Sequence, residues 1–156
     1  SINYDDIKLL APIPQRLFNG RRAITVELFF KPTAIDSSFG LISGSSFDLY
    51  YSFSTPRSFR FRINGEGPNS AVASYPATIT PNQWHHTVAV YDADKRIIKI
   101  FLDSQELKNP NIYSIPSPAS PLIETGYLWM GISDYSGEYL SGLIDRVRVY
   151  TSTSGF

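Results

Sequence analysis

Short apolar or alternating runs, separated by clusters of Gly, Pro, Asn, Asp and Ser, recur along the whole chain. Residues 58–64 show this most clearly, because Phe59, Phe61 and Ile63 occupy every second position and polar side chains occupy most of the others. A period of two is typical of a strand with one buried face. The pattern therefore predicts an almost entirely β protein with about ten strands.

One segment, residues 84–91, carries apolar side chains on both faces, which predicts a central strand. The turn at 92–95 joins it to a hairpin partner, and the proline-rich stretch 109–121 is predicted to be an extended surface loop. Two packed antiparallel sheets bury so many one-sided strands most economically, so the predicted class is a β-sandwich. The predicted strands are residues 24–30, 47–53, 58–64, 84–91, 96–102, 128–132 and 140–150.

Composition supports this class and excludes several functions. Ten Phe and ten Tyr, with 11 Pro and 10 Gly, suit strands and turns better than helices. The 156 residues are expected to form one domain, 1–156, with 151–156 as a flexible tail. Because 14 basic side chains balance 14 acidic ones, no positive field favours nucleic acid. No apolar stretch is long enough for membrane insertion, and the lack of Cys excludes disulfides and thiol catalysis.

Two motifs narrow the class. Residues 82–92 read NQWHHTVAVYD and are followed by IKIFLDS at 98–104, and residues 140–150 read LSGLIDRVRVY. Together they resemble the laminin G-like branch of the concanavalin A-like lectin and glucanase jelly rolls, and the resemblance spans about residues 22–151 in family order. It implies a two-sheet antiparallel jelly-roll β-sandwich.

Three positions depart from the family pattern. Phe29 or Phe30 stands where many members have Trp, and another large aromatic side chain can fill the same core. Ser104 replaces the turn glycine after Asp103, which is tolerable where the turn needs no positive φ. Arg146 replaces the usual Glu after Asp145 and removes one carboxylate from any cation site there.

Catalysis is not expected, so the protein is predicted not to be an enzyme. The glucanase relatives carry an E-x-D-x-x-E strand that holds two carboxylates roughly 5 Å apart, and no such run occurs here. His85 and His86 are neighbours on a strand, so their side chains point to opposite faces and cannot act on one substrate or metal. Hydrogen-bonded structural histidines are the favoured interpretation.

The resemblance also implies a calcium site in which an Asp of the closing motif works with backbone carbonyls and an N-terminal residue. Asp145 matches the motif position, and Asp5 or Asp6 could approach it if the terminal strands pair. The alternative is that Asp145 is simply a partner for a nearby Arg or for backbone N–H groups. The first interpretation makes Ca²⁺ a structural cofactor, and no other cofactor is expected.

Glycan binding needs an aromatic ring that can stack on a sugar and planar polar side chains that reach its hydroxyls. An exposed strand Tyr can equally serve cross-strand packing. Trp84 and Trp129 lie among apolar neighbours and are predicted to be core. The candidate ligand-binding residues lie on the polar side of two strands and in the loop 133–139, and they are Tyr50, Arg60, Arg62, Asp134, Tyr135 and Tyr139.

The predicted function is a non-catalytic recognition or adhesion module that acts outside the cytoplasm, at the cell surface or on a virion, with carbohydrate as its ligand. A cell-surface or extracellular protein is the other expected partner, because laminin G-like sandwiches also bind proteins or serve structural roles. The alternative function is a structural or assembly subunit of a surface filament, virion or larger secreted protein. Homo-oligomerisation and attachment to a larger polypeptide are compatible with both.

Overall fold

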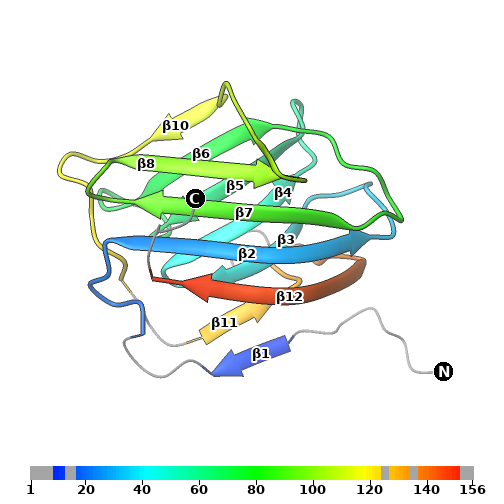
Figure 1. Cartoon of the computed structure of the whole chain (residues 1–156), viewed down its shortest axis with the longest axis horizontal. Coiled ribbons are helices and arrows are strands. Elements are labelled where there is room, and N and C mark those ends of the chain that lie inside the picture. The colour runs from blue at the N-terminus through cyan, green and yellow to red at the C-terminus, as the bar shows by residue number, and fades with distance from the viewer. Residues whose placement is uncertain (1–8, 13–16, 124–126, 134–136, 152–156) are drawn as a thin grey trace.

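Two antiparallel sheets pack face to face in the computed structural model, which describes residues 9–12, 17–123, 127–133 and 137–151 (Figure 1). The seven-stranded sheet has the order β1 (Leu9–Pro12), β11 (Tyr127–Met130), β3 (Phe39–Gly44), β4 (Phe47–Ser52), β5 (Ser58–Ile63), β6 (Ala71–Pro76) and β10 (Ile112–Ser114). The five-stranded sheet, in front in Figure 1, has the order β12 (Gly142–Tyr150), β2 (Ala23–Pro32), β7 (His85–Asp92), β8 (Ile97–Leu102) and β9 (Gln105–Glu106).

This arrangement confirms the predicted antiparallel jelly-roll β-sandwich. The described segments contain no helix at all, and so none that is long and apolar enough to cross a membrane.

The core lies between the sheets and is built largely from aromatic side chains. Phe59 and Phe61 of β5 are fully buried, as their alternation predicts. Phe30 of β2 contacts Phe59 edge to face across the two sheets, with ring centroids 5.9 Å apart. Burying one such side chain contributes about 2 kcal/mol, so the packed rings hold the layers together.

The central position predicted for residues 84–91 is confirmed. β7 lies between β2 and β8. Ala89 and Tyr91 belong to the core, and Val88 and Val90 on the other face are also almost completely buried. A strand covered on both faces tolerates apolar residues at every position, which is why its sequence does not alternate.

The proline-rich stretch 109–121 differs in part from the predicted loop. Its first part forms β10, which pairs with β6, and its later part follows an irregular path. The Tyr91 hydroxyl donates a hydrogen bond of 2.7 Å to the Ser120 carbonyl and ties this later part to the sandwich. β6 itself has the sequence AVASYP, whose small side chains lack the strong alternation needed to predict it.

The two histidines point to opposite faces, as predicted. His85 Nδ1 lies 2.8 Å from Asp103 Oδ2, and His86 Nε2 lies 3.1 Å from Glu27 Oε1 on the outer face.

The turn after β8 departs from the expectation for Ser104. Asp103 has a φ of 49° and Ser104 has a φ of 69°. Positive φ at two consecutive residues is the geometry of a type I′ turn. The turn therefore needs positive φ at Ser104. The condition under which serine would be tolerated there, a turn without positive φ, is not met.

Candidate functional site

Three of the predicted ligand-binding residues lie together on the outer face of the seven-stranded sheet. Tyr50 of β4 stands opposite Arg60 of β5, and Arg60 Nη1 donates a hydrogen bond of 2.8 Å to the Tyr50 hydroxyl. Arg62 Nη2 reaches the same hydroxyl at 3.5 Å. Although the sequence places them on the polar side of their strands, where exposure is expected, Tyr50 is only 4% exposed and Arg62 only 8%. Desolvation raises the pKa of Tyr50, although the two guanidinium groups act in the opposite direction.

The described parts of the loop at 131–140, residues 131–133 and 137–140, lie against this face. Ser133 Oγ donates a hydrogen bond of 2.9 Å to Asp48 Oδ2, and the Gly40 amide donates one of 3.1 Å to the Glu138 carbonyl. A Cβ on Gly40 would overlap the backbone carbon of Ile132, so only glycine allows residues 132 and 133 to approach β3 this closely. Residues 131–133 and 137–138 thus form one wall beside the polar residues.

Two aromatic side chains of β11 extend the same face. Leu128 and Met130 pack toward the core, so the alternating residues Tyr127 and Trp129 point outward. Tyr127 is 54% exposed and Trp129 is half-buried. The predicted core position of Trp129 is therefore wrong, and the alternation within YLWM is the sequence signal that indicates its true place.

Register places Trp129 in line with the polar residues. Trp129 is opposite Ser43 of β3, Ser43 is opposite Asp48 of β4, and Asp48 is opposite Arg62 of β5. We name the set Asp48, Tyr50, Arg60, Arg62, Tyr127 and Trp129 the outer face site. The other tryptophan, Trp84, is 49% exposed and lies before β7, so its predicted burial is also wrong.

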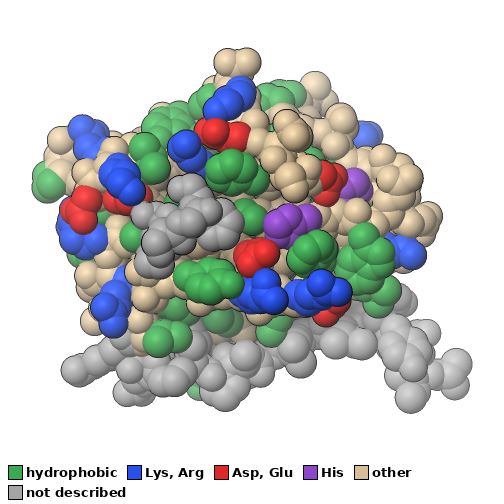
Figure 2. All heavy atoms as spheres, in the orientation of Figure 1, with side chains coloured by type: hydrophobic (Ala, Val, Ile, Leu, Met, Phe, Trp, Pro, Cys, Tyr) green, Lys and Arg blue, Asp and Glu red, His purple; other side chains and the backbone are tan. Residues whose placement is uncertain are grey.

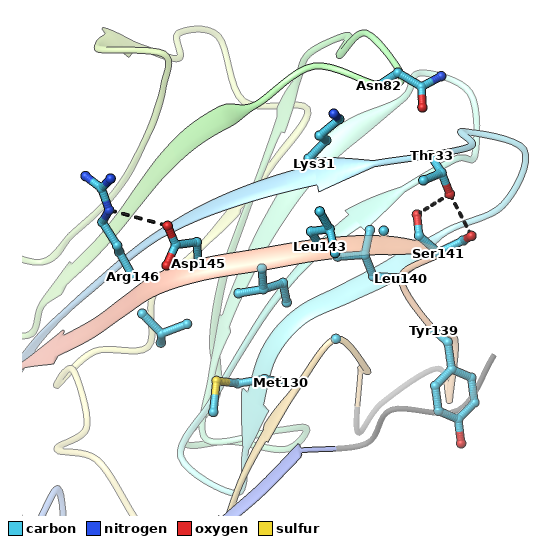
Figure 3. Close-up of a pocket in the computed structure, with 14 residues that line it drawn as sticks. Lys31, Thr33, Asn82, Met130, Tyr139, Leu140, Ser141, Leu143, Asp145 and Arg146 are labelled. Atoms are coloured by element: carbon cyan, nitrogen blue, oxygen red, sulfur yellow. Dashed lines mark hydrogen bonds and ion pairs between the residues drawn. The ribbon is translucent and has the colours of Figure 1, made fainter. Parts of the chain in front are cut away.

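The remaining described candidates, Tyr139 and Asp145, line a different hollow. This groove has a volume of about 920 Å³ and runs beside β12 (Figure 3). Met130, Leu140, Ile144 and Val147 are among its apolar wall residues. Its polar wall residues are Lys31, Thr33, Asn82, Tyr139, Ser141, Asp145 and Arg146.

The described residues alone do not supply a calcium site at Asp145. Its side chain is 56% exposed, and Arg146 Nε lies 3.4 Å from its Oδ2 atom, which is the Arg partnership predicted as the alternative. No group of three His, Cys, Asp or Glu within the described ranges could hold a metal ion, whereas calcium takes six to eight oxygen ligands. Asp5 and Asp6 lie outside the described residues, as do the ligand candidates Asp134 and Tyr135.

The calcium site therefore stays a prediction. Its test is the melting temperature with calcium and with a chelator, for the wild type and for Asp145→Asn. A reversible rise that the substitution abolishes would support the site, and the absence of a rise would remove it.

The two packed antiparallel sheets define the class of jelly-roll β-sandwiches. The family model described as the concanavalin A-like lectin/glucanases superfamily matches residues 5–154, and the chain belongs to this family. No individually curated protein matches the sequence.

Among solved structures, the chain is similar to the CBM40 domain of a Ruminococcus gnavus sialidase bound to α2,3-sialyllactose, with a TM-score of 0.61, 14% identity, and coverage of 85% of this chain and 78% of that one. It is similar to domain 4 of a Geobacillus stearothermophilus extracellular arabinanase in complex with arabinotriose, with a TM-score of 0.54, 19% identity, and coverage of 89% and 65%. It is also similar to domains LG4-5 of the mouse laminin α1 chain, with a TM-score of 0.64, 16% identity, and coverage of 94% and 40%. At these identities the likeness shows the shared fold.

Proposed function

We propose that this protein is a non-catalytic carbohydrate-binding module that acts outside the cell and binds its ligand on the outer face site. The observation that carries the proposal is the pair Tyr127 and Trp129, which point outward from one strand beside the row of Asp48 and Arg62. Aromatic rings can stack on the apolar face of a sugar, and the guanidinium of the part-exposed Arg60 can hydrogen-bond its hydroxyls while the buried Asp48 and Arg62 support the site from below. The tight Arg60–Tyr50 contact fixes the polar groups before a ligand arrives.

Glu27 and Asp48 do not form the pair of neighbouring carboxylates that hydrolysis needs. Glu27 lies on the outer face of the five-stranded sheet, between His86 and Arg148. Asp48 lies on the outer face of the other sheet. Two groups on opposite sides of a sandwich cannot flank one glycosidic bond as a hydrolase requires.

The similar structures support the ligand class and the location. The Ruminococcus gnavus domain is described with sialyllactose and the Geobacillus domain, part of an extracellular enzyme, with arabinotriose.

The experiment is a glycan array followed by affinity electrophoresis in the polysaccharide that gives the strongest signal. Tyr127→Ala and Trp129→Ala should each weaken retention about tenfold or more, because truncating an aromatic anchor typically costs about 2 kcal/mol of binding free energy. Trp84→Ala is the matched control, since it removes an exposed tryptophan elsewhere and should leave retention unchanged. Melting temperatures of all three variants separate loss of binding from loss of folding.

Equal retention of the wild type and both β11 variants would contradict this site. Failure of the wild type to bind any glycan, together with assembly of the purified chain, would favour the structural role instead.

A further inference from the structure

β12 forms one edge of the five-stranded sheet. It spans nine residues, and within the described part of the chain it pairs only with β2. A long edge strand presents unpaired backbone N–H and C=O groups and is a template for another strand. Beside it runs the groove of about 920 Å³, whose wall includes Met130, Leu140 and Ile144 (Figure 3). Charged and apolar side chains lie together along this edge, in front in Figure 2.

The outward side chains of β12 show what can pair with it. In chain order they are Leu143, Asp145, Arg148 and Tyr150, which stand opposite Lys31, Phe29, Glu27 and Thr25 of β2. Asp145 and Arg148 share a face, although they are three residues apart, because a β-bulge shifts the register between them. The order of these side chains is apolar, acidic, basic, aromatic. When a second copy of the strand runs antiparallel to the first, acidic faces basic and apolar faces aromatic.

We propose that β12 pairs antiparallel with β12 of a second copy of this chain, about a two-fold axis between Arg146 and Val147. In this register Asp145 of each copy stands opposite Arg148 of the other, and Leu143 stands opposite Tyr150. On the inner face, Ile144 of each copy stands opposite Val149. A two-fold axis requires such self-complementarity of one surface patch. The product is a ten-stranded sheet that is continuous across both copies.

The bulge does not prevent this pairing. An extra residue in only one strand would shift it against its partner, but both copies carry the same extra residue at the axis, so the register on either side is kept. The positive φ of Arg146, 52°, confines the irregularity to the centre, and its guanidinium lies 5.3 Å from the centroid of the Phe29 ring, away from the pairing edge.

The second copy also accounts for the apolar wall. The inner row of its β12, which includes Ile144 and Val149, would approach Met130 and Leu140 across the groove. Leu143 is 56% exposed and Tyr150 41% exposed in a single copy, and each would gain an apolar neighbour.

The charged pairs set the register of this dimer. Exposed ion pairs contribute little to affinity, so the Asp145–Arg148 pairs select the register while backbone bonds and apolar contacts supply the binding. A net charge of zero gives no repulsion between copies.

Sedimentation velocity over a concentration series, without any glycan, tests the proposal. The wild type should pass from monomer to dimer. Asp145→Arg and Arg148→Asp should each weaken the dimer at least about tenfold, because each places like charges opposite one another across the axis. Lys108→Glu, a charge change at an exposed side chain beyond β9 at the other edge of the sheet, should have no effect.

Sedimentation velocity of an equimolar mixture of the two single variants is the decisive test of the proposed register. A copy with Asp145→Arg presents two cations and a copy with Arg148→Asp presents two anions, so an equimolar mixture should form a heterodimer although each variant alone is monomeric. Melting temperatures confirm that both variants are folded. A wild type that is monomeric at every concentration, or folded single variants that dimerise as well as the wild type, would overturn the proposal.

Discussion

Asp103 makes two separate contacts at the turn between β8 and β9. Its Oδ2 atom lies 2.8 Å from His85 Nδ1, and its Oδ1 atom accepts a hydrogen bond of 2.8 Å from the His86 amide. The same residue has a positive φ, which Asp tolerates better than most residues. Ser104, also at positive φ, has no such advantage, because its Cβ is strained in the left-handed region.

Replacing Ser104 with Gly should therefore stabilise the protein. Relief of the left-handed backbone is worth about 1 kcal/mol, which raises the melting temperature by about 2–4 °C in a chain of this size. Ser104→Ala is the control, since it keeps the Cβ and should bring no gain. Differential scanning calorimetry of the three proteins decides the matter, and a lower melting temperature for Ser104→Gly would contradict the turn geometry.

Single residues also show where sequence reasoning reaches its limit. The opposite orientation of His85 and His86 follows from strand geometry alone and is correct. The burial of Arg62 does not follow from alternation, which assigns a face but not what covers it. The apolar neighbours of Trp129 predict a core position, whereas the inward packing of Leu128 and Met130 places its side chain outside.

At the scale of whole elements, the contact between β3 and residues 131–133 depends on a single glycine, Gly40. The Gly131 amide donates a hydrogen bond of 3.0 Å to the Leu41 carbonyl, and Gly40 lies directly beneath the Ile132–Ser133 peptide. This packing of backbone on backbone fixes the loop that walls the outer face site.

Gly40→Ala should displace that loop and destabilise the protein by at least about 2 kcal/mol, because overpacking against backbone cannot be relieved by a rotamer change. Gly65→Ala is the control, since a Cβ there meets open space and only the left-handed backbone costs about 1 kcal/mol. Urea denaturation measures both. Equal losses for the two variants would show that the loop does not press on β3.

Strong elements are predictable from this sequence and weak ones are not. β7 carries apolar residues at nearly every position of its second half, and this pattern alone predicts its place at the centre of its sheet. β10 is three residues long and wholly exposed, so no burial pattern marks it. The groove beside β12 depends on how two sheet edges approach in space, and no periodicity along one strand reports that distance.

Stability against pH is a property of the whole molecule, and we expect buried tyrosines to lower it at alkaline pH. Desolvation raises the pKa of Tyr75 to about 12, and it also raises the pKa of Tyr51 and Tyr91. The Tyr75 hydroxyl donates a hydrogen bond of 2.7 Å to the Ile98 carbonyl and so joins the two sheets. That bond exists only while the phenol keeps its proton.

The folded protein should therefore lose stability at high pH. Since the pKa of Tyr75 is higher in the folded state than its ordinary value of 10.0, its contribution is complete below pH 10 and declines as the pH rises through about 12. Chemical denaturation at a series of alkaline pH values should show a steeper decline for the wild type than for Tyr75→Phe. Parallel curves would contradict a coupling between this phenol and folding.

The whole fold can be predicted from the sequence. Two motifs, residues 82–92 and 140–150, identify the family, and the alternation of apolar residues indicates which side chains form the core. The outer face site is accessible in part, since alternation puts Tyr50, Arg60 and Arg62 on one face, where the structure has them. Tyr127 and Trp129 join them only through the order of strands, which sets β11 beside β3 and cannot be derived from local pattern.

The pairing of β2 with β12 has a consequence for how the chain folds during its synthesis. Glu27 meets Arg148, 121 positions later in the chain, and Pro32 stands opposite Gly142. The hairpin of β7 and β8 can form as soon as it emerges from the ribosome, but one side of β2 must wait for β12. A nascent chain thus carries an apolar strand with one unpaired side until residues 142–150 have been translated, and ribosome-bound intermediates stalled before residue 142 should need chaperone protection that the folded sandwich does not.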